Sequence, residues 1–598
     1  ILLSHRRLAI VDLSTAGHQP MGSASGRYVI AFNGEIYNHL NLRAELEQLG
    51  LAETWRGHSD TESLLAGFDA WGSEATLRKC SGMFAIALWD LQTGSLTLVR
   101  DRMGEKPLYY GWQGQGEEAV FLFGSELKAL RAHPAFHAPI NRGALALLMR
   151  HNYIPAPYSI YEGIAKLEPG SLLQVSLVEP QPSTHRFWDL TEVACSGRTR
   201  PFAGTPEQAV DALENLTKDA IRQQMMADVP LGAFLSGGID SSTVVALMQA
   251  QSSLPVKTFT IGFNEERYNE AEHAKAVATH LGTEHTELYV TPEQALAVIP
   301  RLPQLYCEPF ADSSQIPTFL VSELARQHVT VSLSGDAGDE LFCGYTRYGI
   351  AERWWQRLSA LPVPARRAMG FVLNGVNSPY LRRQLPGSLG DKFDKGLDML
   401  AGNDMEAIYR SIISNLVDPC DWLVGVDAEP NTVFAGSIPK LLTFRSMERM
   451  MILDTLSYLP DDILVKLDRA AMGVSLESRV PFLDHRIVEF AWQLPLDYKR
   501  HDGVSKWPLR QILYRYVPRE LIDRPKRGFS VPLHEWLRGQ LRDWAEVLLE
   551  PHRLQREGFF NVTKVRNAWA EHLSGRRNWT PHLWTVLMFQ AWLEEQSH

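Results

Sequence analysis

The sequence predicts two unlike domains in one chain: an α+β layered domain, then an α/β domain with a parallel sheet and a helical C-terminal part. Three observations lead to this prediction. Short apolar runs separated by turn residues dominate the first third of the chain. After about residue 205, short apolar strands followed by glycine turns alternate with helical patterns, as in βαβ units. From about residue 345 onward the pattern is mainly helical.

The first third contains five segments with the composition of strands. They are residues 27–35, 82–90, 95–101, 119–126 and 171–177. Between the first two, residues 40–50 place Leu42, Leu46 and Leu49 on one helical face. Gly50 follows as a plausible C-terminal cap of that helix.

A change of composition between Pro180 and Thr205 predicts a domain border, because proline, glycine, serine and threonine accumulate there. We therefore expect a first domain over residues 1–190, a linker over 191–206 and a second domain over 207–598. Residues 206–226 read as a helix with Thr205 as its N-cap. Strands are expected at 232–236, 256–263 and 329–335.

Composition excludes several classes of protein. The 598 residues are 45% hydrophobic and 21% charged, which is ordinary for a globular protein. Lys plus Arg number 59 against 69 Asp plus Glu, and the net charge of −10 argues against a dedicated nucleic-acid binder. No apolar run approaches the roughly 20 residues that span a bilayer. Five cysteines without a CxxC pair indicate a reducing, cytoplasmic location and argue against a cysteine zinc site.

The strongest chemical signal follows the strand that ends near Leu235. A serine and two glycines make a tight turn there, and a helix begins at about Asp240. Such glycines let the backbone approach an anion, and the N–H groups of the turn and of the helix N-terminus bind phosphate oxygens. The lysine of a Walker A loop is absent. The candidate phosphate-binding residues are Ser236, Gly237, Gly238, Asp240, Ser241 and Ser242.

A second turn after a strand carries Ser334, Gly335, Asp336, Asp339 and Glu340. Three acidic residues within five positions are costly to place together without a cation. Because parallel strands open on one crevice at their carboxyl ends, both turns are expected to face the same ligand. The first and second turns then supply one carboxylate each, Asp240 and Asp339, to Mg²⁺ on a pyrophosphate group. Taken alone, the second segment could instead be a solvated acidic loop.

The first turn, SGGIDSS, resembles the pyrophosphate loop of PP-loop ATP pyrophosphatases. The two turns in this order resemble the synthetase domain of glutamine-dependent asparagine synthetases. FNGEIYN and RDRMGEKPLYY upstream, and LESRVPFLDHR and RPKRGFSVP downstream, are similar to segments of the same family, so the resemblance covers nearly the whole chain.

That resemblance implies a first domain with an Ntn-type αββα sandwich that hydrolyses glutamine. It implies a second, ATP pyrophosphatase domain that adenylates a carboxylate and releases AMP and pyrophosphate. The cofactors would be ATP and Mg²⁺. The partners would be small molecules, namely glutamine, ATP and aspartate or another carboxylate, with neither nucleic acid nor membrane, and a homodimer fits the family.

The same resemblance assigns the glutamine-binding residues. Arg7 would bind the substrate carboxylate, Asn33 and Gly34 the developing oxyanion, and Glu35 and Asp60 the amino and amide ends. An arginine fork suits a carboxylate, and an amide with a backbone N–H can aim two donors at an oxyanion. Without the resemblance, an Asn-Gly pair is typical of a hairpin turn.

The family's nucleophile is an N-terminal cysteine, and none stands at the start of this sequence, which begins with Ile1. Cys80 and Cys195 do not match that position and read as structural. We expect Arg7 to lie on a strand and the domain to need upstream residues; the alternative is a synthetase that uses ammonia only.

Several assignments in the second domain depend on resemblance and fold analogy. Lys526 is the candidate for stabilising charge on pyrophosphate, although a basic patch with its neighbouring arginines is the alternative. Asp336 could accept a proton during amide formation. Ile261 is expected near the adenine. Ala337 replaces a family glycine, so the turn is expected to differ if that position needs a positive φ.

Two clusters downstream stay open. The first either shapes the acceptor pocket or locks helices together, and it comprises Glu477, Arg479 and Asp484. The second we interpret as an internal salt-bridge cluster, and it comprises Lys466, Asp468 and Arg469. Nothing in the sequence fixes the acceptor: aspartate is the default, and a sugar acid or peptide carboxylate is the alternative. A different PP-loop enzyme or a degenerate binding protein fits less well.

Overall fold

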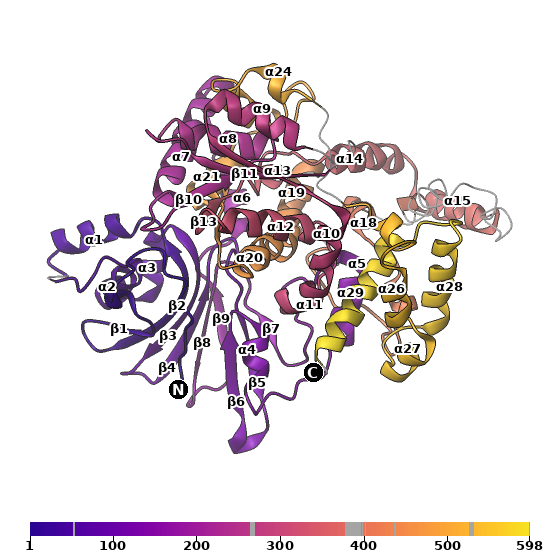
Figure 1. The fold of residues 1–598 in the computed structure, drawn as a ribbon, viewed down its shortest axis with the longest axis horizontal. Coiled ribbons are helices and arrows are strands. Elements are labelled where there is room, and N and C mark those ends of the chain that lie inside the picture. The colour runs from indigo at the N-terminus through magenta and orange to yellow at the C-terminus, as the bar shows by residue number, and fades with distance from the viewer. Residues whose placement is uncertain are drawn as a thin grey trace.

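The structure is a computed structural model that describes all residues except 52–53, 264–269, 377–395, 397–398, 401, 403, 436–437, 525–530 and 597–598. The first half is built on two sheets (Figure 1). One has the strand order β1-β2-β3-β4-β8-β9, and the other β6-β5-β7. The strands are β1 (Met21–Gly22), β2 (Tyr28–Ile36), β3 (Gly82–Asp90), β4 (Ser95–Arg100), β5 (Tyr109–Gln113), β6 (Val120–Gly124), β7 (Ala165–Lys166), β8 (Ser171–Ser176) and β9 (Ser183–Arg186).

Helices cover the outer face of each sheet, which gives the αββα order of layers. On the larger sheet, alternate residues of β2 and β3 such as Phe32 and Phe84 pack with Leu64 and Phe68 of the covering helices. The opposite face meets the smaller sheet through residues such as Leu98. The Ntn-type sandwich is therefore confirmed. Its helices are α1 (His39–Gln48), α2 (Asp60–Trp71) and α3 (Ser73–Lys79) on one side, and α4 (Leu127–Arg131) and α5 (Arg142–His151) on the other.

The predicted linker forms helix α6 (Leu190–Thr199), which packs against α21 (His485–Gln493). The next helix, α7 (Pro206–Gln224), begins after Thr205, whose side chain and Gln208 form a reciprocal capping box. The N-cap predicted at Thr205 is therefore confirmed.

The second half contains the expected parallel sheet, with strand order β12-β11-β10-β13-β14. Its strands are β10 (Leu231–Phe234), β11 (Lys257–Phe263), β12 (Glu284–Val290), β13 (Val331–Leu333) and β14 (Glu477–Arg479). Helices pack on both faces because the central strands bury apolar side chains on either side, Phe259 and Ile261 in one core and Ala233 and Val331 in another. The helices around it are α8 (Ile239–Gln249), α9 (Ala271–Leu281), α10 (Pro292–Val298), α11 (Leu302–Leu305), α12 (Gln315–Arg326), α13 (Gly338–Leu341), α20 (Leu464–Met472), α22 (Leu496–Lys499), α23 (Trp507–Leu513) and α24 (Arg519–Ile522).

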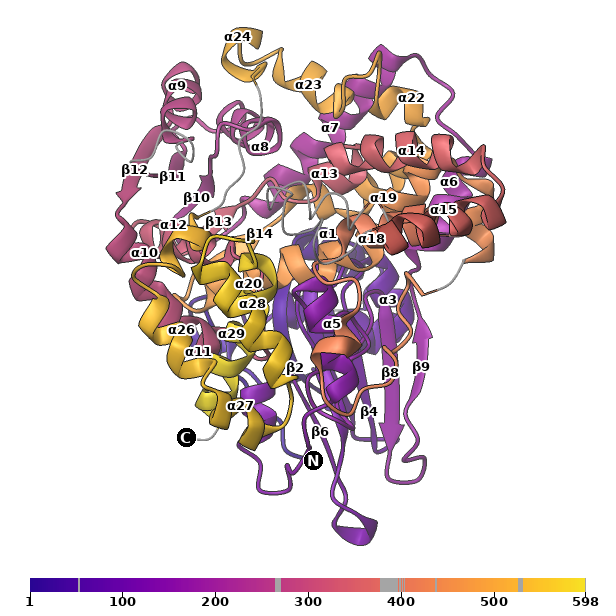
Figure 2. The ribbon, with the colours of Figure 1, turned by 90° about the vertical axis from the view of Figure 1, so that its right-hand side faces the viewer.

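The remaining helices form two groups. The first lies beside the parallel sheet, to its right in Figure 2, and comprises α14 (Thr346–Ser359), α15 (Val363–Val376), α18 (Met405–Ile413) and α19 (Ser446–Leu456). The C-terminal group comprises α25 (Leu533–Trp536), α26 (Arg542–Leu548), α27 (Pro551–Glu557), α28 (Val562–Leu573) and α29 (Thr580–Gln596). Helix α29 packs on α5 of the first half, and one apolar core contains residues from both, including Leu145 and Trp592.

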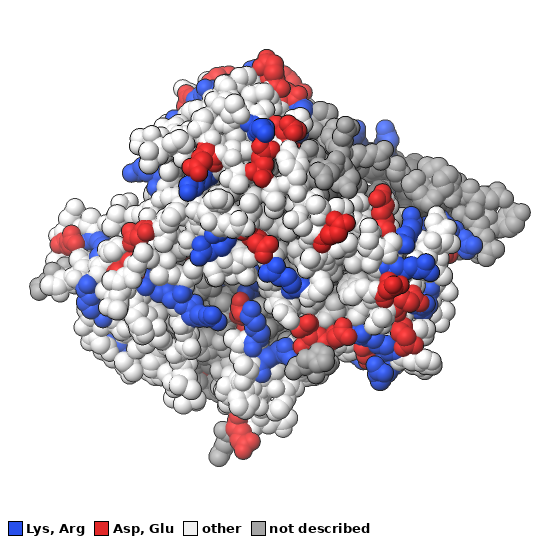
Figure 3. Space-filling model, viewed as in Figure 1, with Lys and Arg blue, Asp and Glu red and all other residues white. Residues whose placement is uncertain are grey.

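Charge is mixed on the surface. On the face shown in Figure 3, lysines and arginines are interspersed with acidic residues over both halves. Among the helices that the structure describes, none combines the length and the hydropathy needed to cross a bilayer. The fold thus offers two places for chemistry, namely the edge of the sandwich that faces the second half and the carboxyl edge of the parallel sheet.

Candidate active sites

A small cavity lies where the sandwich meets the second half, and it gathers all five residues predicted to bind glutamine. Arg7, Asn33, Gly34, Glu35 and Asp60 line it. The second half closes it with the side chains of Met472 and Glu477. Residues far apart in the sequence are therefore brought to one cavity that belongs to both halves.

Asn33 and Gly34 lie inside strand β2, so the alternative of a plain hairpin turn is wrong. They pair with Ala85 and Phe84 of β3. Gly34 has a φ of +152°, and a Cβ at this position would collide with the carbonyl of Met83. Only glycine fits here, and the side chain of Asn33 is held by a 3.0 Å hydrogen bond that its Nδ2 donates to Ser125 Oγ.

Two buried carboxylates give the cavity its electrostatics. Asp60 begins α2, and its Oδ2 accepts the backbone N–H of Ile36 at 2.8 Å. Burial raises the pKa of Asp60. Burial also raises the pKa of Glu35 well above its ordinary value, and the neighbouring charges of Asp60 and Glu477 add to this effect. The pair therefore favours a ligand that brings a positive charge.

Arg7 faces this cavity from a segment without regular structure, so the expectation that it lies on a strand is wrong. Its Nη2 donates to the carbonyls of Val11 at 2.7 Å and Asp12 at 2.9 Å. Gly17 lies directly under the guanidinium, where a Cβ would collide with it. The arginine is thus fixed in place by backbone groups.

The five cysteines are all described, and none lines the glutamine cavity. Cys80 is fully buried, and burial raises the pKa of its thiol to about 12. A thiol with so high a pKa is a poor nucleophile at neutral pH. The structural interpretation of Cys80 agrees with this environment.

The second cavity, of about 800 Å³, lies at the carboxyl ends of β10, β11 and β13. The two predicted turns meet there, since a Cβ on Gly335 would collide with the backbone of Ser241, and a Cβ on Gly338 with the side chain of Asp240. The solvated-loop alternative for the acidic turn is therefore wrong. Predicted residues that line the cavity are Ser236, Gly237, Gly238, Asp240, Ser241, Ile261, Ser334, Gly335, Asp336 and Asp339.

Sequence reasoning missed the lysine at the centre of this cavity. Lys506 Nζ forms ion pairs with Asp240 and, at 2.7 Å, with Asp339 Oδ1. Its side chain is only 5% exposed. Burial alone would lower the pKa of Lys506, but the two carboxylates raise it above its ordinary value. The ammonium therefore stays charged between the turns.

Lys526, which was predicted for this charge, lies outside the described residues. The signal for Lys506 in the sequence is weak, because it is a single lysine after a turn with no basic neighbour. In the structure, Gly344 leaves the room that this ion pair needs, since a Cβ at Gly344 would collide with both Lys506 and Asp339.

The structure differs from two further predictions, one for Ser242 and one for Ala337. Ser242 is fully buried in α8 and does not line the cavity, so a direct contact between it and phosphate is not supported. Ala337 has a φ of +71°, so the turn keeps the left-handed conformation that was expected to be lost without glycine. An alanine in this region is strained by about 1–2 kcal/mol.

The same cavity also carries a lysine and two further acids. Lys466 Nζ donates to Asp312 Oδ2 at 2.8 Å, and both line the cavity. Asp336 lies nearby, and its Oδ2 accepts from Ser334 Oγ at 2.5 Å. The cavity can thus hold a small zwitterion beside the phosphate-binding turns.

The predicted salt-bridge cluster of Lys466, Asp468 and Arg469 is wrong, because the three residues have different partners. Asp468 pairs with Lys106 of the sandwich at 2.9 Å. Arg469 pairs with Glu126 at 3.3 Å and donates to the carbonyl of Ser125, the residue that holds Asn33. Two of the three therefore fasten α20 to the glutamine cavity.

The other open cluster also lies between the halves. Glu477 lines the glutamine cavity, and Arg479 reaches Glu35. Asp484 caps α21 by accepting the N–H of Arg486 at 3.0 Å, and it accepts the hydroxyl of Ser81 at 3.1 Å. None of the three lines the ATP cavity, so the acceptor-pocket alternative is wrong.

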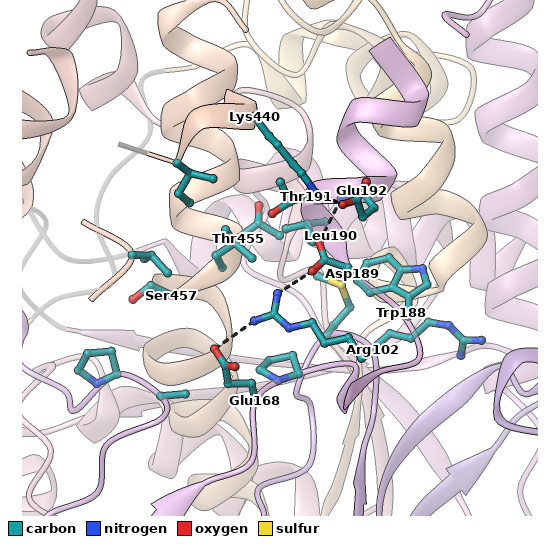
Figure 4. Close-up of a pocket in the computed structure, with 18 of the residues that line it drawn as sticks. Arg102, Glu168, Trp188, Asp189, Leu190, Thr191, Glu192, Lys440, Thr455 and Ser457 are labelled. Carbon is teal, nitrogen blue, oxygen red and sulfur yellow. Dashed lines mark hydrogen bonds and ion pairs between the residues drawn. The ribbon is translucent and has the colours of Figure 1, made fainter. Parts of the chain in front are cut away.

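A third cavity, of about 450 Å³, lies between the sandwich, α6 and α19 (Figure 4). Most of its charged side chains pair with one another: Arg186 with Glu168 and Asp189, and Glu192 with Lys440. None of the residues predicted for either site lines this cavity, so we assign neither reaction to it.

An arginine and paired carboxylates in an αββα sandwich, beside two glycine turns at the carboxyl edge of a parallel sheet, are the arrangement expected of a glutamine amidotransferase joined to an ATP-using synthetase. Residues 1–188 match the glutamine amidotransferase domain, and residues 212–594 match asparagine synthase. The chain belongs to the asparagine synthase family, whose members are C–N ligases.

Three relatives carry the name asparagine synthetase (glutamine-hydrolyzing). A protein of Mycobacterium bovis is 34% identical over 99% of this chain and 88% of its own length. One of Bacillus subtilis is 30% identical over 98% of this chain and 88% of its own. One of Methanocaldococcus jannaschii is 34% identical over 80% of this chain and 91% of its own. The family supports ATP-dependent amidotransferase activity.

Proposed function

We propose that this amidotransferase converts aspartate to asparagine. Glutamine hydrolysis would supply ammonia, and ATP would activate the acceptor carboxylate as an acyl-adenylate with release of pyrophosphate. The observation that carries the proposal is the pairing of Asp240 and Asp339 across Lys506, at the point where two strand-end turns meet. An ATP phosphate chain and its cation need this combination of carboxylates, ammonium and backbone donors.

In the first half, the proposed roles follow from charge and geometry. Arg7 would bind the glutamine carboxylate, and Glu35 with Asp60 would bind its ammonium and amide groups. The Nδ2 of Asn33 and the N–H of Gly34 would donate to the oxyanion that forms when the amide carbon is attacked. Each such donor contributes about 2.7–4 kcal/mol to transition-state stabilisation.

In the second half, the N–H groups of Gly237 and Gly238 and the hydroxyls of Ser236 and Ser241 would bind pyrophosphate oxygens. Ser334 and Gly335 would do so from the other turn, with Ile261 beside the base. Asp240 and Asp339 fit Mg²⁺, which binds through one or two carboxylates plus phosphate oxygens. When bound, Mg²⁺ neutralises charge on the leaving pyrophosphate.

Lys506 would stabilise the same negative charge from the protein side. The acceptor carboxylate oxygen attacks the α-phosphate of ATP, the bond to the β-phosphate breaks, and pyrophosphate leaves. Ammonia then attacks the acyl carbon, AMP leaves, and a proton passes to a base. Asp336, beside the acceptor end of the cavity, is the proposed base.

The choice of aspartate is supported by two further charged residues that line the cavity. The ion pair of Lys466 and Asp312 offers one positive and one negative group. These groups complement the carboxylate and ammonium of an α-amino acid whose side-chain carboxylate reaches toward Ser236. An acceptor without an ammonium group would leave Asp312 paired with Lys466 and would gain nothing from its charge.

The test is carboxylate-dependent exchange of labelled pyrophosphate into ATP, with an Asp240→Ala variant in parallel. Aspartate is expected to give exchange in the unaltered chain and none in the variant. Exchange with another carboxylate but not with aspartate would reassign the acceptor. Equal exchange in both proteins would show that the two turns are not the ATP site.

A further inference from the structure

Arg479 is a fully buried arginine at the end of β14, with 1% of its side chain exposed. Its Nε donates to Glu477 Oε1 at 2.8 Å, and its Nη1 donates to the carbonyls of Gln224 at 2.7 Å and Met226 at 2.8 Å. Three hydrogen bonds therefore fix the plane of the guanidinium.

The remaining nitrogen of this guanidinium approaches Glu35, which lines the glutamine cavity. Nη2 is buried and has no hydrogen-bond partner in the described part of the chain, and it lies 3.8 Å from Glu35 Oε1. That separation is too long for a hydrogen bond but close enough for strong charge attraction. A buried donor without a partner costs about 1–3 kcal/mol, so it needs a physical reason.

The reason lies in the charge on Glu35. Burial and the carboxylates of Asp60 and Glu477 all favour its neutral form, and Arg479 opposes them. Among the other cations that line the cavity, Lys106 is already paired with Asp468, and Arg7 donates to backbone carbonyls. Glu35 can bind an ammonium group strongly only when it is ionised, and Arg479 is the cation that lowers the free-energy cost of that ionisation.

Arg479 also contacts the other site. Its carbonyl accepts the N–H of Ser334 at 2.8 Å, and Ser334 lines the ATP cavity. Its guanidinium lies 5.4 Å from the ring of Tyr37, two residues after Glu35. One residue therefore joins the strand that ends in the acidic turn to the wall of the glutamine cavity.

We propose that Arg479 is a positioning residue for glutamine. The synthetase half supplies this arginine, and the arginine acts through Glu35. This inference rests on the proposed function of Glu35 as a ligand of glutamine. It explains why the glutamine site includes the second half: without Arg479, three carboxylates would share one buried place without the nearest compensating charge. Binding of the substrate ammonium then completes the balance of charge.

The test compares two variants that each break the same buried ion pair. Arg479→Gln removes the positive charge beside Glu35, and glutamine affinity measured by titration calorimetry is expected to fall about tenfold or more. Glu477→Gln removes a negative charge beside Glu35, and affinity is expected to rise. A purely structural role would lower affinity in both, because each variant leaves one buried charge alone.

A double variant guards against a folding defect. Glu477→Gln with Arg479→Gln leaves neither charge buried alone, and its glutamine affinity is expected to fall about tenfold below that of Glu477→Gln alone. Aspartate-dependent pyrophosphate exchange in each variant reports whether the second half is folded.

Equal affinity of the double variant and Glu477→Gln would overturn the inference, as would equal losses in both single variants. If the unaltered chain does not bind glutamine, the proposed function of the first half fails and this inference fails with it. Glutamine binding that does not respond to Arg479 would remove only the positioning role.

Discussion

Each of the two cavities contains a pair of carboxylates, but only the pair in the ATP cavity has a buried ammonium group between its members. In the glutamine cavity, burial raises the pKa of both Glu35 and Asp60. In the ATP cavity, Lys506 lies between Asp240 and Asp339 and compensates their charge. The comparison teaches that carboxylates poised for a cationic substrate keep their nearest internal cation beyond hydrogen-bond distance, as Glu35 keeps Arg479 at 3.8 Å. Those that support a polyanion pair directly with one.

The largest expected effect tests the internal cation of the ATP cavity. Lys506→Met should lower the rate of pyrophosphate exchange by about 100- to 1,000-fold, because charge on the leaving group loses its ammonium partner. Glutamine affinity should not change. Lys440→Met is the matched control, since this lysine pairs with Glu192 on the wall of the third cavity. A loss of exchange in Lys440→Met as large as that in Lys506→Met would contradict the comparison.

The next effect tests the glutamine cavity from its backbone. In Gly34→Ala, the new Cβ meets the carbonyl of Met83, and the free energy of unfolding should fall by about 3 kcal/mol. Gly94→Ala is the control, because Gly94 has a φ of +63° and open space around it. Denaturant unfolding of both variants separates the collision from the cost of the backbone angle. Similar losses in the two would argue against a tight β2–β3 contact.

A smaller effect concerns the pH dependence of stability. Because the folded pKa of Glu35 lies above its ordinary 4.5, the folded state binds more protons, and its contribution to stability is lost as pH rises from about 4.5. Glu35→Gln removes this loss, worth about 1.4 kcal/mol per unit of pKa difference. Melting temperatures at pH 5 and pH 8 should therefore differ less in the variant. A steeper fall in the variant would show that Glu35 is ionised and well compensated.

The smallest effect belongs to the acidic turn. Ala337→Gly should raise the free energy of unfolding by about 1 kcal/mol, since glycine adopts a φ of +71° without strain. Ala212→Gly, inside α7, should lower it by about the same amount. Denaturant unfolding measures both. If Ala337→Gly is destabilising, the strain at this turn is absent.

Much of the fold could be predicted because its signals are local. Residues 82–90 were expected as a strand and form β3 with the same bounds. The two glycine turns were placed on one crevice because parallel strands share a carboxyl edge, and β10 and β13 are direct neighbours. The five glutamine-cavity residues were named through resemblance and lie together.

The rest depends on contacts between distant segments. Lys506 meets Asp240 across 266 residues, and no local pattern marks it. The basic run around Lys526 was more visible in the sequence. Arg479 lies within a motif whose sequence fits two roles equally well, shaping the acceptor pocket or holding helices together. Only packing of the two halves reveals that it faces Glu35.

The core that Leu145 of α5 and Trp592 of α29 share has a consequence for the chain as a whole. A proteolytic nick between Leu190 and Thr205 would cut the connection without freeing two folded proteins, because the C-terminal helices would remain bound to the sandwich. Residues 1–190 expressed alone would expose that apolar face to water and to aggregation. Heating the whole chain in a calorimeter should then give one cooperative endotherm, because the two halves would fold and unfold as one unit.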